Sequence, residues 1–133
     1  MAQGKVAVIR SDLDIVIART LARDTAKSLG FGAIDQARIA TAVSELARNI
    51  FLYAGTGTVS VREIERAGRK GIEIVCDDQG PGIANIDLVM RDGYSTSRGM
   101  GMGLPGAKRL MDEFDIRSQE GVGTTVTCRK WRT

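Results

Sequence analysis

Apolar residues recur at spacings of three and four positions in two stretches of the N-terminal half of the chain. The first stretch predicts a helix over about residues 13–29, with Asp12 as its N-cap and Gly30 at its end. The second predicts a helix over about residues 36–54 that ends at Gly55. The apolar positions are Leu13, Val16, Ile17, Leu21 and Ala22 in the first helix, and Ile39, Ala42, Val43, Leu46, Ile50 and Tyr53 in the second. Each set follows one helical face, so both helices are expected to pack one side against a core.

Apolar and polar residues alternate in several shorter segments, which predicts a sheet. Residues 58–64 and 71–76 are expected to form a hairpin around a loop at 65–70. The other predicted strands cover residues 6–9, 114–118 and 124–131, and a third helix covers residues 104–113. Residues 78–103 are rich in Gly, Ser and Thr around a short helical piece at 86–90, which is typical of a long functional loop. The predicted order is βααββαββ.

The composition of the 133 residues indicates one globular domain, residues 1–133. Hydrophobic residues make up 43% and charged residues 26%, enough to bury a single core. No apolar run approaches the roughly 20 residues that span a bilayer, and residues 1–10 lack the layout of a signal peptide, so we expect a cytoplasmic protein without a membrane partner. Cys76 and Cys128 lie far apart in alternating segments and are expected to be reduced core thiols.

Histidine is absent, which excludes His-based triads, His metal sites and a phosphoacceptor histidine. Acid–base chemistry therefore falls to carboxylates. The 19 basic residues against 16 acidic ones give a net charge of +3, too mild an excess to argue for nucleic acid as a partner. The basic residues near the C-terminus are interpreted as an ordinary solvated surface: Lys108, Arg109, Arg129, Lys130 and Arg132.

Glu45 and Asn49 are four residues apart in the second predicted helix. This spacing places them about 40° apart around the helix axis, at the shoulder of the apolar stripe, so both can face one cleft. A solvated helix face with an incidental Glu/Asn pair is the alternative, and the pair taken alone favours it.

A carboxylate and two glycines follow the strand at 71–76. Strand alternation puts Asp78 on the same face as the apolar residues and Asp77 on the other. A carboxylate on the helix-covered side needs a partner, and an amino group of a ligand would serve. Gly80 and Gly82 let a ligand approach the backbone closely. A simple Asp–Gly turn is an equally good interpretation of this motif alone.

Three alternate glycines, Gly99, Gly101 and Gly103, precede the third helix, between Arg98 and Leu104. Free amide groups at a helix N-terminus, together with the helix dipole, favour phosphate. The segment is neither a Walker A loop, since GxxxxGK[ST] is absent, nor a Rossmann fingerprint, since it follows a loop. A flexible linker is the alternative.

The conjunction is more specific than any one motif: ExxxN on a helix, DxGxG after a strand, GxGxGL before a helix, and GVGT at the start of a strand. In this order the motifs resemble the GHKL ATP-binding family, which includes gyrase, Hsp90, histidine kinases and MutL, over nearly the whole chain. The resemblance implies an α/β fold, the two-layer Bergerat sandwich, with a mixed β-sheet covered by three helices. The glutamate in ExxxN resembles the anti-sigma-factor branch of serine kinases. The runs GYSTS and GLPGAKRLMDEF resemble most closely the stressosome switch kinases.

The resemblance implies a role for each motif residue. Glu45 would be the general base that takes the proton of a protein Ser or Thr hydroxyl, and Arg98 would clamp the γ-phosphate. Asn49 would offer an oxygen to Mg²⁺. The residues implied to hold ATP or ADP are Asn49, Asp78, Gly80, Gly82, Ile83, Gly99, Gly101, Gly103, Leu104 and Thr124. Among these, Asp78 would accept from the adenine 6-amino group, with support from Thr124.

The resemblance also implies partners. A protein serine/threonine kinase of this branch would phosphorylate STAS-domain proteins of a stressosome and regulate a PP2C-type phosphatase through that enzyme's regulatory domain. The alternative is an anti-sigma factor that sequesters a sigma factor and phosphorylates its antagonist. An ATPase would use the same glutamate on water, but 133 residues leave no room for the dimerisation or transducer domain that such relatives need.

Overall fold

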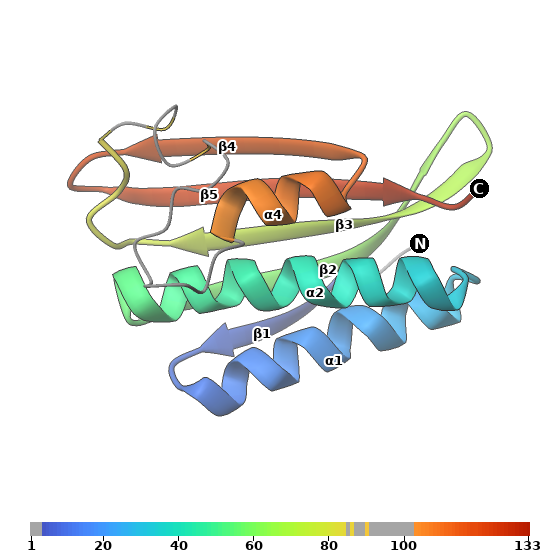
Figure 1. The fold of residues 1–133 in the computed structure, drawn as a ribbon, viewed down its shortest axis with the longest axis horizontal. Coiled ribbons are helices and arrows are strands. Elements are labelled where there is room, and N and C mark those ends of the chain that lie inside the picture. The colour runs from blue at the N-terminus through green and yellow to red at the C-terminus, as the bar shows by residue number, and fades with distance from the viewer. Residues whose placement is uncertain (1–3, 85, 87–89, 91–102) are drawn as a thin grey trace.

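The computed structural model describes residues 4–84, 86, 90 and 103–133. Its elements are β1 (Lys5–Ile9), α1 (Asp12–Ser28), α2 (Ala33–Asn49), the π-helical turn η1 (Ile50–Ala54), β2 (Gly57–Arg66), β3 (Arg69–Asp78), α4 (Gly103–Leu110), β4 (Glu113–Gln119) and β5 (Gly123–Trp131). Over this part of the chain the predicted order of strands and helices is confirmed. The helices lie together on one side of the sheet, which gives the two-layer α/β arrangement that was expected (Figure 1). None of the described helices is long and apolar enough to cross a membrane.

The five strands form one sheet in the order β1-β2-β3-β5-β4, and every neighbouring pair is antiparallel. The prediction of a mixed sheet is therefore wrong. The chain does cross over through α4 between β3 and β4, and these two strands run in the same direction. They are not neighbours, however, because β5 returns between them and pairs antiparallel with both.

The core lies between the helices and one face of the sheet. Strand alternation is confirmed there, since Ile72, Ile74 and Cys76 are buried in the core cluster. The buried residues of α1 are Ile15, Ala18, Ala22 and Ala26. The prediction for α1 is wrong at Leu13, Val16 and Ile17, which are exposed. Small alanine side chains let α1 pack closely against its neighbours. The prediction relied on the spacing of large apolar side chains and therefore missed a buried face made mostly of alanine.

Both long helices differ from the predictions at their ends, and α2 begins at Ala33, three residues earlier than expected. Ser11, not Asp12, is the N-cap of α1, and the Asp14 carboxylate accepts hydrogen bonds from the Arg10 amide and the Ser11 hydroxyl at 2.9 and 3.2 Å. The second helix ends as an α-helix at Asn49 and continues as η1, closed by a 2.9 Å bond from the Gly55 amide to the Ile50 carbonyl. A π-turn interrupts the regular helix directly after the ExxxN motif.

The β2–β3 hairpin is longer than predicted because its turn is tighter. Only Ala67 and Gly68 separate the strands, and both have positive φ, 53° and 80°. Such a pair is typical of a two-residue type I′ turn, whose twist matches that of the strands. The predicted loop at 65–70 is therefore mostly strand. Alanine is an uncommon residue at the first turn position, so the sequence carried no clear signal.

The open face of the sheet carries a row of alternating charges on four adjacent strands. Glu73 pairs across the ladder with Arg62 and Arg129, and Arg129 pairs with Glu113. The Glu73 carboxylate accepts from Arg62 at 2.6 Å and from Arg129 at 2.8 Å. Burial alone raises the pKa of Glu73, but the bonds and charges of the two arginines outweigh it and hold that pKa below its usual value. Arg129 thus belongs to a structural network, contrary to the solvated surface that was expected.

Lys130 is also not part of a solvated surface. It is 7% exposed and points to the helix-covered side of the sheet, where its ammonium group donates to the Leu110 carbonyl at 2.9 Å. Asp112 lies 3.5 Å and Asp35 3.9 Å from the same nitrogen. The C-terminus of α4 is thereby tied to the sheet and to the first turn of α2. These contacts hold the C-terminal end of α4, the helix whose N-terminal end follows the glycine motif.

Candidate functional site

The predicted motifs meet at one end of the molecule. The C-terminal ends of α2 and β3 and the turn between β4 and β5 lie at the left in Figure 1, and α4 starts on that side. Segments more than 50 residues apart come into contact there, because the Gly103 amide donates to the Glu45 carboxylate. Arg98, Gly99 and Gly101 lie outside the described residues, so their predicted roles stay predictions.

Glu45 stands between α2 and the N-terminus of α4. One carboxylate oxygen accepts from the Gly103 amide at 3.3 Å and the other from Arg48 at 3.2 Å, and the side chain is 13% exposed. A carboxylate is favoured at this position by the dipole of α4. Both bonds are long, so little holds the carboxylate away from an incoming proton donor. Gly103, with φ +48°, was predicted as a phosphate-holding amide and here donates to Glu45.

Asn49 lies one turn after Glu45, at the last α-helical position before η1. Its side chain is half-buried, and no described residue forms a hydrogen bond with its carboxamide. A free carboxamide oxygen is a hard ligand of the kind that Mg²⁺ takes together with phosphates and water. Among the described residues no cluster of three carboxylates or thiols could form an all-protein metal site. The residues present therefore fit a magnesium ion brought in with a phosphate ligand.

Asp78, Thr124 and Ser118 form a polar row across three adjacent strands. Asp78 on β3 is the register partner of Thr124 on β5, which is the register partner of Ser118 on β4. Strand alternation puts all three on the helix-covered face, as the sequence predicted for Asp78. The Thr124 and Ser118 hydroxyl oxygens are 2.8 Å apart. Ser118 was not predicted as a site residue, although its position in β4 places it on this face.

The segment after β3 is held against the β4–β5 turn by main-chain contacts. The Gly80 amide donates to Asp78 Oδ1 at 2.9 Å, the Ile83 amide to the Ser118 hydroxyl at 2.7 Å, and the Gly121 amide to the Pro81 carbonyl at 2.7 Å. Gly82 has φ +75°, and a Cβ there would collide with the carbonyl group of Gln119. Gly82 thus serves the close approach of this segment to the β4–β5 turn, whereas Gly80 lies against η1, where a Cβ would come within 2.6 Å of Ala54 Cβ.

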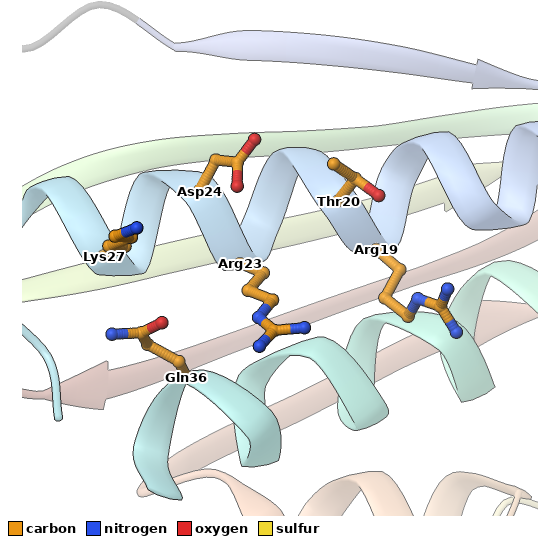
Figure 2. A pocket seen from close by; sticks show the side chains of 6 residues that line it. All are labelled: Arg19, Thr20, Arg23, Asp24, Lys27 and Gln36. Carbon is orange, nitrogen blue, oxygen red and sulfur yellow. The ribbon is translucent and has the colours of Figure 1, made fainter. Parts of the chain in front are cut away.

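A separate groove lies between α1 and the first turn of α2, and its lining is largely charged. Its volume is about 310 Å³. Its lining residues are Arg19, Thr20, Arg23, Asp24, Lys27 and Gln36. Figure 2 shows the Arg19 and Arg23 side chains extending from α1 toward α2. Gln36 lies nine residues before Glu45 along α2, which is about 14 Å at 1.5 Å per residue, so the groove is separate from the nucleotide motifs.

Comparison with known proteins identifies the family in which this arrangement of motifs occurs. A family profile described as "Histidine kinase-, DNA gyrase B-, and HSP90-like ATPase" matches residues 34–132. The chain belongs to this family. Family membership accounts for the arrangement of the ExxxN helix, the DxGxG segment and the start of α4 around one end of the sheet, and it makes the chain an ATP-binding protein.

Among curated relatives, the serine/threonine-protein kinase RsbT of Bacillus subtilis is 57% identical over 123 residues, which cover 92% of both chains. An anti-sigma F factor of Caldanaerobacter subterraneus is 30% identical over 86% of this chain and 82% of its own. Similarity to RsbT is thus far higher than to the anti-sigma factor.

Solved structures confirm the fold. The RsbU and RsbW domains of Rv1364c from Mycobacterium tuberculosis match with a TM-score of 0.64 and 18% identity, over 100% of this chain and 33% of theirs. The mycobacterial sensor histidine kinase MprB matches with a TM-score of 0.58 and 20% identity, over 98% of this chain and 99% of its own. At these identities the two structures support the two-layer fold and nothing finer.

Proposed function

We propose that this chain is an ATP-dependent protein serine/threonine kinase in which Glu45 is the general base. Its similarity to RsbT, over nearly the full length of both chains, supports kinase activity. The observation that carries the role of Glu45 is its position: the carboxylate faces the N-terminus of α4, where phosphate is favoured, and is held there by two long hydrogen bonds.

In the proposed reaction the Glu45 carboxylate accepts the proton of a substrate Ser or Thr hydroxyl. The hydroxyl oxygen forms a bond to the γ-phosphorus, and the bond between that phosphorus and the bridging oxygen to the β-phosphate breaks, which releases ADP. The phosphate charge is met by backbone amides at the start of α4 and by Arg98. The adenine 6-amino group donates to Asp78, while Gly80, Gly82 and Ile83 line the base.

Magnesium is expected at Asn49. The free carboxamide oxygen of Asn49 would complete a coordination shell otherwise made of phosphate oxygens and water, and the ion supplies charge neutralisation for phosphoryl transfer. The side chain is half-buried at a helix end, so its oxygen is placed with little loss of rotamer freedom.

The protein substrates and the output are proposed from the same similarity. We expect STAS-domain proteins of a stressosome, of the RsbS and RsbR kind, as substrates, and the regulatory domain of an RsbU-like PP2C phosphatase as a second partner in the cytoplasm. The alternative, sequestration of a sigma factor, is supported only by relatives near 30% identity.

The test is transfer of labelled γ-phosphate from ATP to a STAS-domain partner. Glu45→Gln keeps the size and the hydrogen-bonding geometry, removes the base, and should lower the rate of labelling by about 10²–10⁴-fold while ATP affinity stays within a few-fold. Glu63→Gln, on β2 among half-exposed residues, is the matched control and should leave the rate unchanged. Full labelling by the Glu45→Gln protein would refute the assignment of the base.

Capture on the immobilised chain separates the two outputs. Recovery of a phosphatase regulatory domain supports the switch-kinase proposal. Recovery of a sigma factor, with no phosphatase, would replace that proposal by the anti-sigma alternative.

A further inference from the structure

We propose that Ser118 determines the nucleotide specificity of this site by fixing the Thr124 hydroxyl as a hydrogen-bond acceptor. The proposal rests on the proposed function in one respect, that a purine base lies against Asp78. It adds a residue outside the ExxxN, DxGxG and GxGxGL motifs, and a chemical reason for selecting a 6-amino purine over a 6-oxo purine.

The Ser118 hydroxyl group has a limited hydrogen-bond capacity. Ser118 Oγ carries one proton and two lone pairs. Three groups lie within bonding distance: the Ile83 amide nitrogen at 2.7 Å, the Gly123 carbonyl oxygen at 3.1 Å and Thr124 Oγ1 at 2.8 Å. The amide can only donate and the carbonyl can only accept.

A single arrangement satisfies all three contacts at once. Ser118 accepts from the Ile83 amide, gives its own proton to the Gly123 carbonyl, and uses its second lone pair to accept the proton of Thr124. These groups are partly buried, where an unmade hydrogen bond is costly, so the complete arrangement is favoured. The proton of the Thr124 hydroxyl is therefore committed to Ser118.

Thr124 then offers only lone pairs to a ligand. Its register partner Asp78 also offers only acceptor oxygens, and Oδ1 is already engaged by the Gly80 amide. A base edge that meets both residues must bring donors, directly or through one water. The 6-amino group of adenine has two hydrogens that it can donate. The 6-oxo group of hypoxanthine or guanine is itself an acceptor, so it would face the acceptor oxygens of Asp78 and Thr124 without a proton between them. Selection thus comes from unmatched acceptors as well as from a good bond to Asp78.

The test compares ATP with inosine triphosphate, which differs at position 6, by titration calorimetry of the full chain with Mg²⁺. In Ser118→Ala the Thr124 proton is released and can donate to a 6-oxo group. The ratio of ATP to inosine triphosphate affinity should fall by about tenfold, the equivalent of ~1.4 kcal/mol. Ser118→Thr retains the hydroxyl and should restore the ratio. Thr125→Val removes a hydroxyl from the opposite face of β5, where it donates to Asp77, and should leave the ratio unchanged.

Ser118→Ala also leaves the Ile83 amide without its partner, so a second variant keeps the test decisive. Thr124→Val retains Ser118 and deletes the acceptor hydroxyl of residue 124. It should lower the ratio of ATP to inosine triphosphate affinity because ATP binds more weakly. An unchanged ratio in both variants, or an equal loss of affinity for both nucleotides, would overturn the role of Ser118. Absence of any ATP binding by the unmodified chain would instead overturn the nucleotide site itself.

Discussion

Replacement of Gly82 by alanine tests the close approach of the segment after β3 to the β4–β5 turn. Gly82 and Gly121 have nearly the same φ, +75° and +80°. Their surroundings differ completely. A Cβ at Gly121 would meet nothing within 4 Å, whereas a Cβ at Gly82 would collide with the Gln119 carbonyl oxygen, lie 2.8 Å from its carbonyl carbon and 2.9 Å from Glu120 Cα. Gly121→Ala is thus a control for the cost of positive φ. The difference between the two variants measures the contact of residue 82 with the backbone of Gln119 and Glu120.

The expected magnitudes follow from these two differences. Positive φ costs an L-residue about 1–2 kcal/mol, partly offset because alanine restricts the unfolded chain, so Gly121→Ala should lose about 1 kcal/mol. Gly82→Ala carries the same cost. In addition its Cβ meets backbone atoms, which cannot rotate away, and overpacking of this kind costs about 1–3 kcal/mol. Gly82→Ala should therefore be about 2 kcal/mol less stable than Gly121→Ala.

Urea unfolding, followed by the fluorescence of the single tryptophan, Trp131, measures the difference. Heating should show it as well, with a midpoint about 8 °C lower for Gly82→Ala than for Gly121→Ala, at roughly 4 °C per kcal/mol for a chain of this size. ATP affinity should fall in Gly82→Ala and stay near that of the parent in Gly121→Ala, because only the first displaces the segment that holds Ile83. Equal losses in the two variants would refute the close approach of residues 80–83 to the β4–β5 turn.

Three further outcomes are expected. Glu73→Gln should destabilise the chain by about 2 kcal/mol at pH 7, since it removes charged hydrogen bonds to two arginines. Because the pKa of Glu73 is lowered in the folded chain, its contribution is present above the unfolded-state pKa of ~4.3 and is lost as pH falls through the folded pKa, so parent and variant should converge in acid unfolding. Burial raises the pKa of Cys76 well above its usual value and that of Cys128 to about 12, so a disulfide reagent at pH 8 should react with neither thiol until urea unfolds the chain. Asn49→Ala should weaken ATP binding roughly tenfold with Mg²⁺ and little without it, as calorimetry in each buffer would show; equal loss in both would contradict a metal ligand.

Most of the fold was predicted because its signals are local. The hairpin strands, the second helix and the side on which Asp78 lies all follow from periodicities within about ten residues. Burial of Ile72, Ile74 and Cys76 confirms the strand face, and burial of Ile39, Val43 and Leu46 confirms the helix face. Some wrong predictions are local, namely the N-cap of α1, the end of α2 and the loop at 65–70, whereas two others concern relations between distant segments. The sheet is antiparallel because β5 enters between β3 and β4, and α1 buries alanines because of how closely its neighbours approach. Neither relation has a local signature.

For the candidate site too, some features could be predicted from the sequence and others were decided only by the tertiary structure. Motif order marked Glu45, Asn49 and Asp78 as candidates only through the resemblance of the combined motifs to an ATP-binding family, and their roles stay predictions. Only tertiary structure decided that Glu45 meets the Gly103 amide, and that Ser118 receives the Ile83 amide and the Thr124 hydroxyl. Motif spacing reflects the geometry of a single helix or strand, whereas the partner of a hydroxyl depends on strand register and on which backbones come close, and these are settled when the whole chain packs.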